Sequence, residues 1–227
     1  MYELMLDTIN MDELTYGINN YPVVGVTSNP SILKKEGNID VYKRLKEIKN
    51  LCGNNRTLHV QVVSTKTEDI IEEAHVILEK LGKDVYIKIP VSKEGLPAIK
   101  ALASEGVNIT ATAIYTTIQG ELAVLAGAKY IAVYYNRMQN NCINPNEVIK
   151  EIRSFIDNSR SDALLLGASF KNVEQVTNAF FYGCQSVTVP FEIIKNALSS
   201  DLVNGAVNGF TKDFELVHGE NKTMKNI

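Results

Sequence analysis

The chain has 227 residues, of which 45% are hydrophobic and 22% charged, and its formal net charge is −3 at pH 7. This composition is ordinary for a soluble globular protein, and the chain is long enough to bury a sizeable core. The slightly acidic charge excludes the basic field that would attract nucleic acid or anionic lipid, so we expect neither as a partner.

The sequence also lacks the usual signals for export, membrane insertion and metal binding. Residues 1–14 are acidic with a broken apolar run, unlike a signal or transit peptide, and no stretch approaches the roughly 18 apolar residues of a membrane span. The three cysteines form no CxxC pair, and the three histidines form no HxH or HExxH pair. We therefore expect a cytoplasmic protein with reduced thiols and no metal.

Short β-branched segments alternate with helical patterns along the chain. In the helical segments 67–82, 146–157 and 172–183, apolar residues recur every three or four positions, as one buried helix face requires. Eight such strand–helix units favour one closed (β/α)8 TIM barrel domain over residues 1–227. An open doubly wound sheet is the alternative, although no GxGxxG follows the first strand. The predicted strands are 2–8, 23–28, 57–63, 85–90, 108–115, 130–135, 162–169 and 186–190.

The segment 202–219 lies beyond the eighth unit. Its spacing predicts an extra, appended C-terminal helix, which would pack across a barrel face or onto a neighbouring subunit.

Alternation within the fourth predicted strand turns Lys88 into the barrel. Val85, Ile87 and Ile89 share one face of the strand, whereas Tyr86 and Lys88 share the other. A buried lysine is costly unless it is paired or used, although a lone strand lysine can also extend its amine to the rim.

The same alternation selects polar residues near the C-terminal ends of five other strands, which is where barrel active sites are built. A lone inward Tyr or Thr is usually a satisfied core group, but six polar residues at equivalent depth favour a catalytic site. The five are Asp7, Gln61, Thr112, Tyr134 and Ser169.

These residue types limit the chemistry. No Ser–His pair, carboxylate cluster for Mg²⁺ or P-loop is evident, whereas a lysine in a largely apolar barrel has a lowered pKa and attacks carbonyls to form an imine. Tyr134 would move protons, directly or through a water held by Gln61 and Thr112. Arg137 would grip a phosphate, or else form a surface salt bridge.

The sequence resembles the transaldolase family, specifically its short bacterial branch and the related fructose-6-phosphate aldolases. The resemblance spans nearly the whole chain, and IKIP followed by EGL, TSNPS and ASFK is specific as a set. The matching stretches are LDT (6–8), GVTSNPSIL (25–33), QVVST (61–65), IKIPVSKEGLPAIKALASEG (87–106), TATAIYTTIQGELAVLAGAKYIAVYYNR (110–137), LLGASFKN (165–172) and GCQSVTVPFEII (183–194).

This resemblance implies a Schiff-base lysine at Lys88 and no metal or organic cofactor. It implies that substrate is held by Asp7, Thr27 and the donor-binding Asn29, phosphate by Arg137 and Ser169, and the catalytic water by Thr112. Residues 27–30 also suit a simple turn into a helix.

Two positions separate the branches of the family. Transaldolases usually carry Glu and Phe where this chain has Gln61 and Tyr134, and the aldolases carry Gln and Tyr. The resemblance therefore favours an aldolase that joins dihydroxyacetone and glyceraldehyde 3-phosphate into fructose 6-phosphate. Transfer of the dihydroxyacetone unit between sugar phosphates is the alternative.

The family usually has Asp and a Gly-rich loop after Arg137, whereas residues 138–146 read MQNNCINPN, which leaves the acceptor open. The related short enzymes form rings stacked as decamers, which implies a homo-oligomer. A barrel that binds ligands without catalysis is the remote alternative.

Overall fold

The computed structural model describes residues 2–227 and divides them into two compact units. The first unit runs to Phe191 and the second comprises Glu192–Ile227. The single domain expected over 1–227 therefore stays a prediction, and the two units are described separately.

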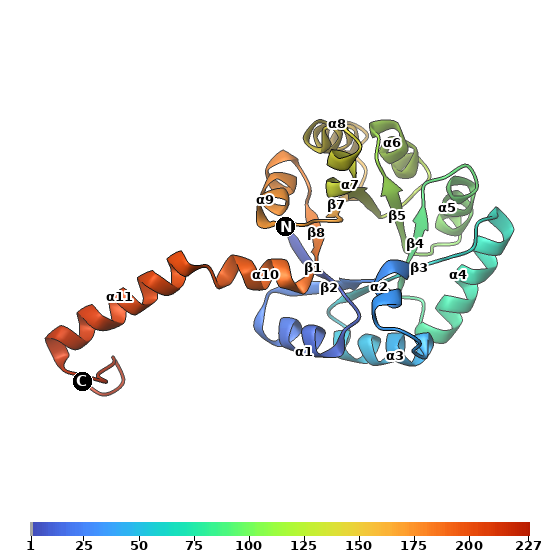
Figure 1. Ribbon diagram of the computed structural model, residues 1–227. Helices are drawn as coiled ribbons and strands as arrows, with labels where there is room; N and C mark the ends of the chain where they lie inside the picture. The colour runs from blue at the N-terminus through green and yellow to red at the C-terminus, as the bar shows by residue number, and fades with distance from the viewer. Residues whose placement is uncertain (1) are drawn as a thin grey trace. The chain divides into compact units, whose positions relative to one another are not determined.

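The first unit is a closed barrel of eight parallel strands in sequence order, which confirms the predicted fold class (Figure 1). Each strand pairs with the next, and β1 closes the barrel against β8. The structure trims the predicted strands by up to three residues, because their ends belong to the connecting loops. The strands are β1 (Glu3–Asp7), β2 (Val23–Thr27), β3 (Thr57–Gln61), β4 (Tyr86–Pro90), β5 (Ile109–Ile114), β6 (Tyr130–Tyr134), β7 (Leu164–Ala168) and β8 (Ser186–Val189).

Helices surround this barrel and bury one face each. In α4 the buried residues Ile70, Ala74, Ile77 and Leu81 recur every three or four positions. The helices of the ring are α1 (Met11–Asn20), α3 (Val41–Cys52), α4 (Thr67–Leu81), α5 (Gly95–Ser104), α6 (Thr117–Leu125), α8 (Pro145–Asn158) and α9 (Val173–Tyr182).

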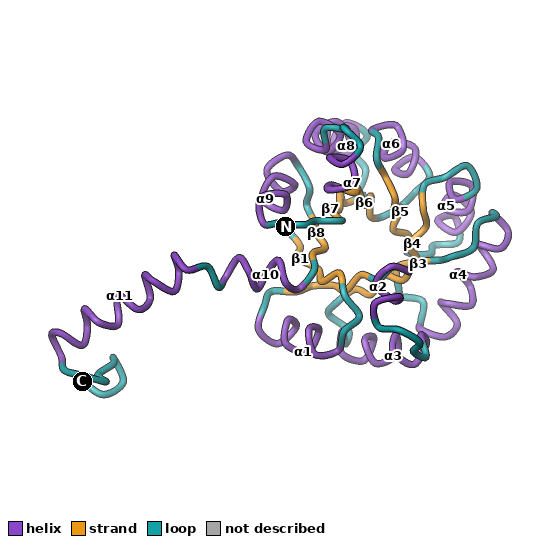
Figure 2. The backbone as a smooth tube through the Cα atoms, in the orientation of Figure 1, coloured by secondary structure: helices purple, strands orange, loops and turns teal. Residues whose placement is uncertain are grey.

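Two short helices follow strands directly and differ from the outer ring. The helix α2 (Pro30–Lys35) begins three residues after β2, and α7 (Tyr135–Asn140) begins at the end of β6. Figure 2 shows them on opposite sides of the ring of strands. Both therefore belong to the end of the barrel where the strands finish.

The barrel interior mixes apolar and polar layers. Met5, Tyr130, Ala132 and Leu166 form a buried cluster inside the barrel. Strand β4 follows the predicted alternation, because Ile87 and Ile89 are fully buried and Lys88 is only 3% exposed. The alternation of side chains therefore carries Lys88 into the barrel, where it is almost fully buried.

The second unit contains α11 (Asp201–His218) and most of α10 (Phe191–Leu198). Ser200 caps α11 by accepting a hydrogen bond from the Val203 backbone N–H, and this helix confirms the predicted C-terminal helix. No residue of α11 is buried. Among residues 2–227, none of the helices combines the length and the apolar character needed to cross a membrane.

Candidate active site

The predicted site residues gather at the end of the barrel where the strands finish. Asp7, Gln61 and Tyr134 are the last residues of β1, β3 and β6, and Lys88 lies in the middle of β4. Ser169 is the exception to the prediction, since it follows β7 instead of lying in it and has a left-handed φ of 64°. That backbone turn directs the chain from β7 into the loop before α9.

One cavity of about 210 Å³ brings six of the nine predicted residues together. It is lined by Asp7, Asn29, Lys88, Tyr134, Arg137 and Ser169. The other three predicted residues lie beside the cavity and contact its lining through hydrogen bonds or strand pairing. They are Thr27, Gln61 and Thr112.

Thr27 orients the carboxylate of Asp7. Its hydroxyl donates to Asp7 Oδ1 over 2.7 Å, and it lies 2.7 Å from the hydroxyl of Thr188. Because Thr27 has one proton and gives it to Asp7, Thr188 must donate to Thr27. The chain of hydroxyls therefore holds Asp7 as an acceptor facing Lys88.

Thr112 orients the phenol of Tyr134 in a similar way. The Thr112 hydroxyl donates to Tyr134 Oη over 3.2 Å, so the phenol's own proton is left to donate elsewhere. Tyr134 is 9% exposed, and the ring of Tyr115 packs edge-on against its ring with centroids 5.7 Å apart. The geometry suits a proton donor that faces the cavity.

Gln61 stands beside the lysine in the sheet. It pairs with Lys88 in the register of β3 and β4. Its Oε1 atom is buried and accepts no hydrogen bond from any residue between 2 and 227. An unsatisfied buried acceptor costs free energy, so this position suits an oxygen that holds a reacting water or a substrate hydroxyl.

Arg137 projects from α7 and forms no ion pair with residues 2–227, which removes the surface salt bridge weighed above. Its guanidinium lies 4.8 Å from the centre of the Tyr134 ring and makes a long, 3.5 Å contact with the Tyr115 hydroxyl. The charge is thus held in place by aromatic groups and remains free to bind an anion.

Hydrogen bonds join the segment that carries Arg137 to the segment that carries Ser169. The Asn136 backbone N–H donates to the Ser169 carbonyl over 3.1 Å. The buried Gln175 side chain donates to Asn136 and Gln139, and its oxygen accepts from the Lys171 backbone N–H. Gln139 belongs to the unusual 138–146 stretch, which therefore helps to position the segments that carry Arg137 and Ser169.

Asn29 both begins α2 and lines the cavity. Its Oδ1 accepts from the backbone N–H groups of Ser31 and Ile32, and Pro30 occupies the first helical turn. The turn expected for residues 27–30 is thus present, and it is compatible with a binding role. Since Oδ1 is used as a cap, the Asn29 amide nitrogen is the group left for a ligand.

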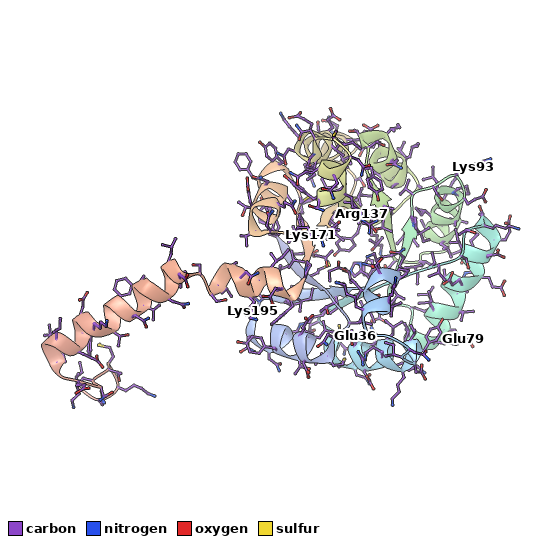
Figure 3. The ribbon with its side chains drawn as sticks, in the orientation of Figure 1. Glu36, Glu79, Lys93, Arg137, Lys171 and Lys195 are labelled. Atoms are coloured by element: carbon purple, nitrogen blue, oxygen red, sulfur yellow. The ribbon has the colours of Figure 1, made fainter. Side chains whose placement is uncertain are left out.

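Sequence reasoning missed three polar residues of the cavity, namely Ser31, Lys35 and Lys171. Figure 3 labels Lys171 and Arg137, which lie on the segments after β7 and β6. Ser31 and Lys35 lie on the six-residue α2, which is too short to show a periodic pattern. Lys171 lies in a loop, where alternation does not apply, although the resemblance included it in ASFK.

The surroundings of Lys88 are more polar than the largely apolar barrel that we expected. His59 is fully buried on β3, and its ring nitrogens lie 2.8 Å from the Thr110 hydroxyl and 2.9 Å from the Thr57 hydroxyl. Burial, and to a lesser degree Lys88, lowers the pKa of His59 to about 3. A neutral histidine therefore lies near the amine without adding a second charge.

Burial still dominates the protonation of Lys88 and Asp7. Desolvation lowers the pKa of Lys88, and the charge of Asp7 partly opposes that shift. Desolvation likewise raises the pKa of Asp7, and Lys88, Thr27 and Lys35 oppose the shift in that order. Since Lys88 makes no ion pair within 4 Å among residues 2–227, its amine is poised to react in the neutral form.

Burial also raises the pKa of Tyr134, against the weaker effects of Thr112 and Arg137. The phenol therefore keeps its proton at neutral pH and can act as an acid. In the described part of the chain, no group of three or more His, Cys, Asp or Glu residues is arranged to hold a metal ion.

A larger cavity, of about 430 Å³, lies elsewhere and contains none of the predicted residues. It is lined by residues of α4, the loop after α4 and the loop before β5, including His75, which is hydrogen-bonded to Glu105. It lacks a buried nucleophile, so the smaller cavity around Lys88 is the candidate active site.

Comparison with known proteins finds a matching family model and a relative that is similar over most of its length. Residues 4–226 match the family model described as transaldolase/fructose-6-phosphate aldolase. The chain is 46% identical over 215 residues to a protein of Streptococcus pneumoniae named "Probable fructose-6-phosphate aldolase", covering 95% of this chain and 97% of that protein.

A solved structure resembles the fold alone. The crystal structure of inosine 5′-monophosphate dehydrogenase from Legionella pneumophila superposes with a TM-score of 0.58 at 11% identity. The match covers 85% of this chain, which spans 58% of the length of that one. The barrel architecture is therefore shared well beyond close relatives.

Proposed function

From the premise that this chain belongs to the transaldolase/fructose-6-phosphate aldolase family of enzymes, we propose that it is a Schiff-base aldolase that cleaves and forms fructose 6-phosphate through Lys88. The observation that carries the proposal is Lys88 itself. It is a buried lysine with a lowered pKa, unpaired, in a cavity with one carboxylate and one phenol. Family membership makes a barrel without catalysis untenable.

The reaction begins when neutral Lys88 Nζ attacks the ketone carbon C2 of the sugar. Loss of water gives an imine, whose protonated form withdraws electrons from the C3–C4 bond. A base removes the proton of the C4 hydroxyl, the bond breaks, and glyceraldehyde 3-phosphate leaves. The dihydroxyacetone unit stays on Lys88 as an enamine.

Release of dihydroxyacetone requires protonation of the enamine at C3 and hydrolysis of the imine that results. Tyr134 is the acid that the geometry favours, either directly or through a water shared with Gln61 and Thr112. Asp7 and Asn29 bind the hydroxyls of the donor, with Thr27 holding Asp7 in place. Arg137 and Ser169, together with Lys171, bind the phosphate.

Borohydride trapping tests the nucleophile. Wild-type protein incubated with dihydroxyacetone and borohydride should gain a covalent adduct that maps to Lys88. Lys88→Met, similar in length but without an amine, should fold and show neither adduct nor turnover. An adduct that persists in Lys88→Met, or one at Lys93 or Lys100, would refute the assignment.

The release of free dihydroxyacetone distinguishes aldolase activity from transaldolase activity. An aldolase should release free dihydroxyacetone from fructose 6-phosphate without an acceptor, since Tyr134 protonates the enamine. The double variant Tyr134→Phe with Gln61→Glu should suppress that release and favour exchange onto erythrose 4-phosphate, measured as sedoheptulose 7-phosphate. Efficient exchange by the wild type with almost no free dihydroxyacetone would make it a transaldolase.

The assembly and the location of the protein follow from the same premise. The stripe of exposed apolar residues on α11 supports a homo-oligomer, a decamer by resemblance. Sugar phosphates and small carbonyl compounds are the expected partners, without nucleic acid, membrane or cofactor. The cytoplasm, where phosphorylated sugars occur, is the expected location.

A further inference from the structure

The side of the cavity with the proposed phosphate contacts is built from two separate segments. Arg137 lies on α7, which follows β6, whereas Ser169 and Lys171 lie in the loop between β7 and α9. Neither Arg137 nor Lys171 forms an ion pair with residues 2–227. Because two cations that line one cavity repel each other, contacts between neutral groups must hold the two segments together.

Gln175, in the first turn of α9, makes polar contacts with both segments. Its Nε2 donates to Asn136 Oδ1 over 3.0 Å and to Gln139 Oε1 over 2.6 Å. Its Oε1 accepts from the Lys171 backbone N–H over 2.7 Å. Both amide protons are therefore used, and the residue is only 6% exposed. One buried amide thus joins the residue before Arg137 to the backbone of Lys171.

The amide of Gln175 is held in place by its own helix. Asn172 caps α9 by accepting from the Gln175 backbone N–H over 2.9 Å, which fixes the first turn. Other contacts between the two segments include the backbone bond from Asn136 described above and the packing of the Tyr135 ring on the Phe170 ring. Apolar packing has no preferred direction, so the hydrogen bonds define the spacing of the segments more closely.

We propose that Gln175 is a positioning residue that sets the spacing of Arg137 and Lys171 and thereby gives the enzyme its preference for phosphorylated aldehydes. The inference rests on the proposed function, since it assumes that the phosphate of glyceraldehyde 3-phosphate lies between these two cations. Gln175 does not line the cavity, so it acts only through the segments that it joins. A phosphate that bridges two cations loses one contact when their spacing changes, whereas an aldehyde without phosphate makes neither contact.

Synthesis from dihydroxyacetone and two aldehydes tests this role. Gln175→Leu keeps a side chain of similar size but removes the amide. The KM for glyceraldehyde 3-phosphate should rise about tenfold, while kcat and the kcat/KM for unphosphorylated glyceraldehyde should stay within about twofold. Gln175→Asn keeps an amide that is one methylene too short to reach both segments. It should show the same split to a smaller extent, and it carries the test if Gln175→Leu does not fold.

Gln185 offers a matched control. Its Oε1 accepts from the Leu165 backbone N–H over 3.1 Å, near the end of the barrel where the strands begin, and it does not line the cavity. Gln185→Leu removes a hydrogen bond of the same kind and should leave the ratio of the two kcat/KM values unchanged. An equal fall of that ratio in Gln185→Leu and Gln175→Leu would show a general loosening of the barrel and would overturn the proposal.

A double-mutant cycle tests whether Gln175 acts through the segment of Arg137. Asn136→Ala removes one acceptor of the amide and leaves the bond to Gln139, so its rise in KM should be smaller than that of Gln175→Leu. The double variant should match Gln175→Leu within about twofold, because both substitutions remove one contact. Effects that multiply in the double variant, or equal losses with both aldehydes in Gln175→Leu, would overturn the proposal.

Binding of fructose 6-phosphate makes the test independent of turnover. Lys88→Met protein is titrated by calorimetry with fructose 6-phosphate, and adding Gln175→Leu should weaken the binding about tenfold. A wild type that fails to cleave fructose 6-phosphate, together with this loss of affinity, would refute the aldolase and leave the role of Gln175 standing. Unchanged affinity would overturn the role of Gln175 whichever reaction the protein catalyses.

Discussion

Arg137 is the residue on which phosphate recognition depends most directly. It forms no ion pair within residues 2–227, and the Tyr134 ring and the Tyr115 hydroxyl hold its guanidinium at the cavity. Arg137→Ala removes a charge-assisted contact worth about 1.5–3 kcal/mol. The apparent KM for glyceraldehyde 3-phosphate should therefore rise roughly ten- to a hundredfold.

An unphosphorylated aldehyde provides the control for that variant. Its kcat/KM should change little in Arg137→Ala, because it has no phosphate to lose. An equal loss with both aldehydes, measured in the direction of synthesis, would show that Arg137 supports Tyr134 and the chemistry instead of the phosphate.

His59 connects the site to the stability of the barrel. Burial lowers its pKa to about 3, from an ordinary value of 6.5. Between those two values the unfolded chain binds a proton that the native state does not. The free energy of unfolding should therefore fall as the pH drops from 6.5 toward 3, by up to about 1.4 kcal/mol per unit from this residue alone.

Denaturant unfolding at several pH values checks this dependence. His59→Gln has no ring to protonate, so its free energy of unfolding should fall less steeply below pH 6.5 than that of the wild type. The loss of the contacts to Thr57 and Thr110 lowers stability at every pH and cancels in the slope. Parallel slopes in the two proteins would contradict a neutral, buried His59.

At the scale of the element, α2 combines a structural and a binding role in Asn29. The side chain caps the helix through Ser31 and Ile32, and it also faces the cavity. Asp is an equally good N-cap, so Asn29→Asp should retain the melting temperature of the wild type. A second carboxylate near Asp7 and Lys88 should nevertheless raise the pKa of the amine and lower kcat/KM at neutral pH.

Asn29→Ala, unlike Asn29→Asp, should lower the stability of the protein. It removes the cap and should destabilise the protein by about 1 kcal/mol. Thermal melting and the pH dependence of cleavage together separate the two variants. An Asn29→Asp protein that melts much earlier, or that keeps full activity at neutral pH, would show that the cap and the binding role are not combined as proposed.

Sequence patterns predicted whole strands well and irregular backbone poorly. Strict alternation in β4 was enough to turn Lys88 inward, because a side chain of a regular strand can take only one of two faces. In β5 the register shifts between Ala111 and Ile114, and Ala113 has a φ of 57°. Alanine gives no sign of such a conformation, so the bulge beside Thr112 could not be predicted.

At the scale of the molecule, the order of the strands followed from the sequence because each strand is joined to the next through at least one helix. Parallel neighbours joined by helices leave few topologies open, and eight strand–helix units in succession favour a closed barrel. The composition of the cavity was less predictable. Lys35 and Lys171 lie outside the strands, so their directions depend on loops and on the short α2.

The helix α11 bears on the assembly of the whole molecule. Val203, Val207, Phe210, Phe214 and Val217 recur every three or four residues and therefore share one face. Phe210 is 72% exposed. A stripe of this kind on a helix without a buried residue is typical of a contact between protein chains.

We therefore expect Phe210→Asp to disrupt the proposed homo-oligomer. The substitution places a charge in the apolar stripe, where desolvation on association would be costly, so light scattering should report a smaller particle at micromolar concentration. Asn208 is the matched control, since it is exposed and lies on roughly the opposite side of α11. Asn208→Asp adds the same charge and should keep the wild-type mass. A wild-type protein with the mass of a monomer would refute the homo-oligomer, and equal masses for wild type and Phe210→Asp would show that this stripe is not the contact.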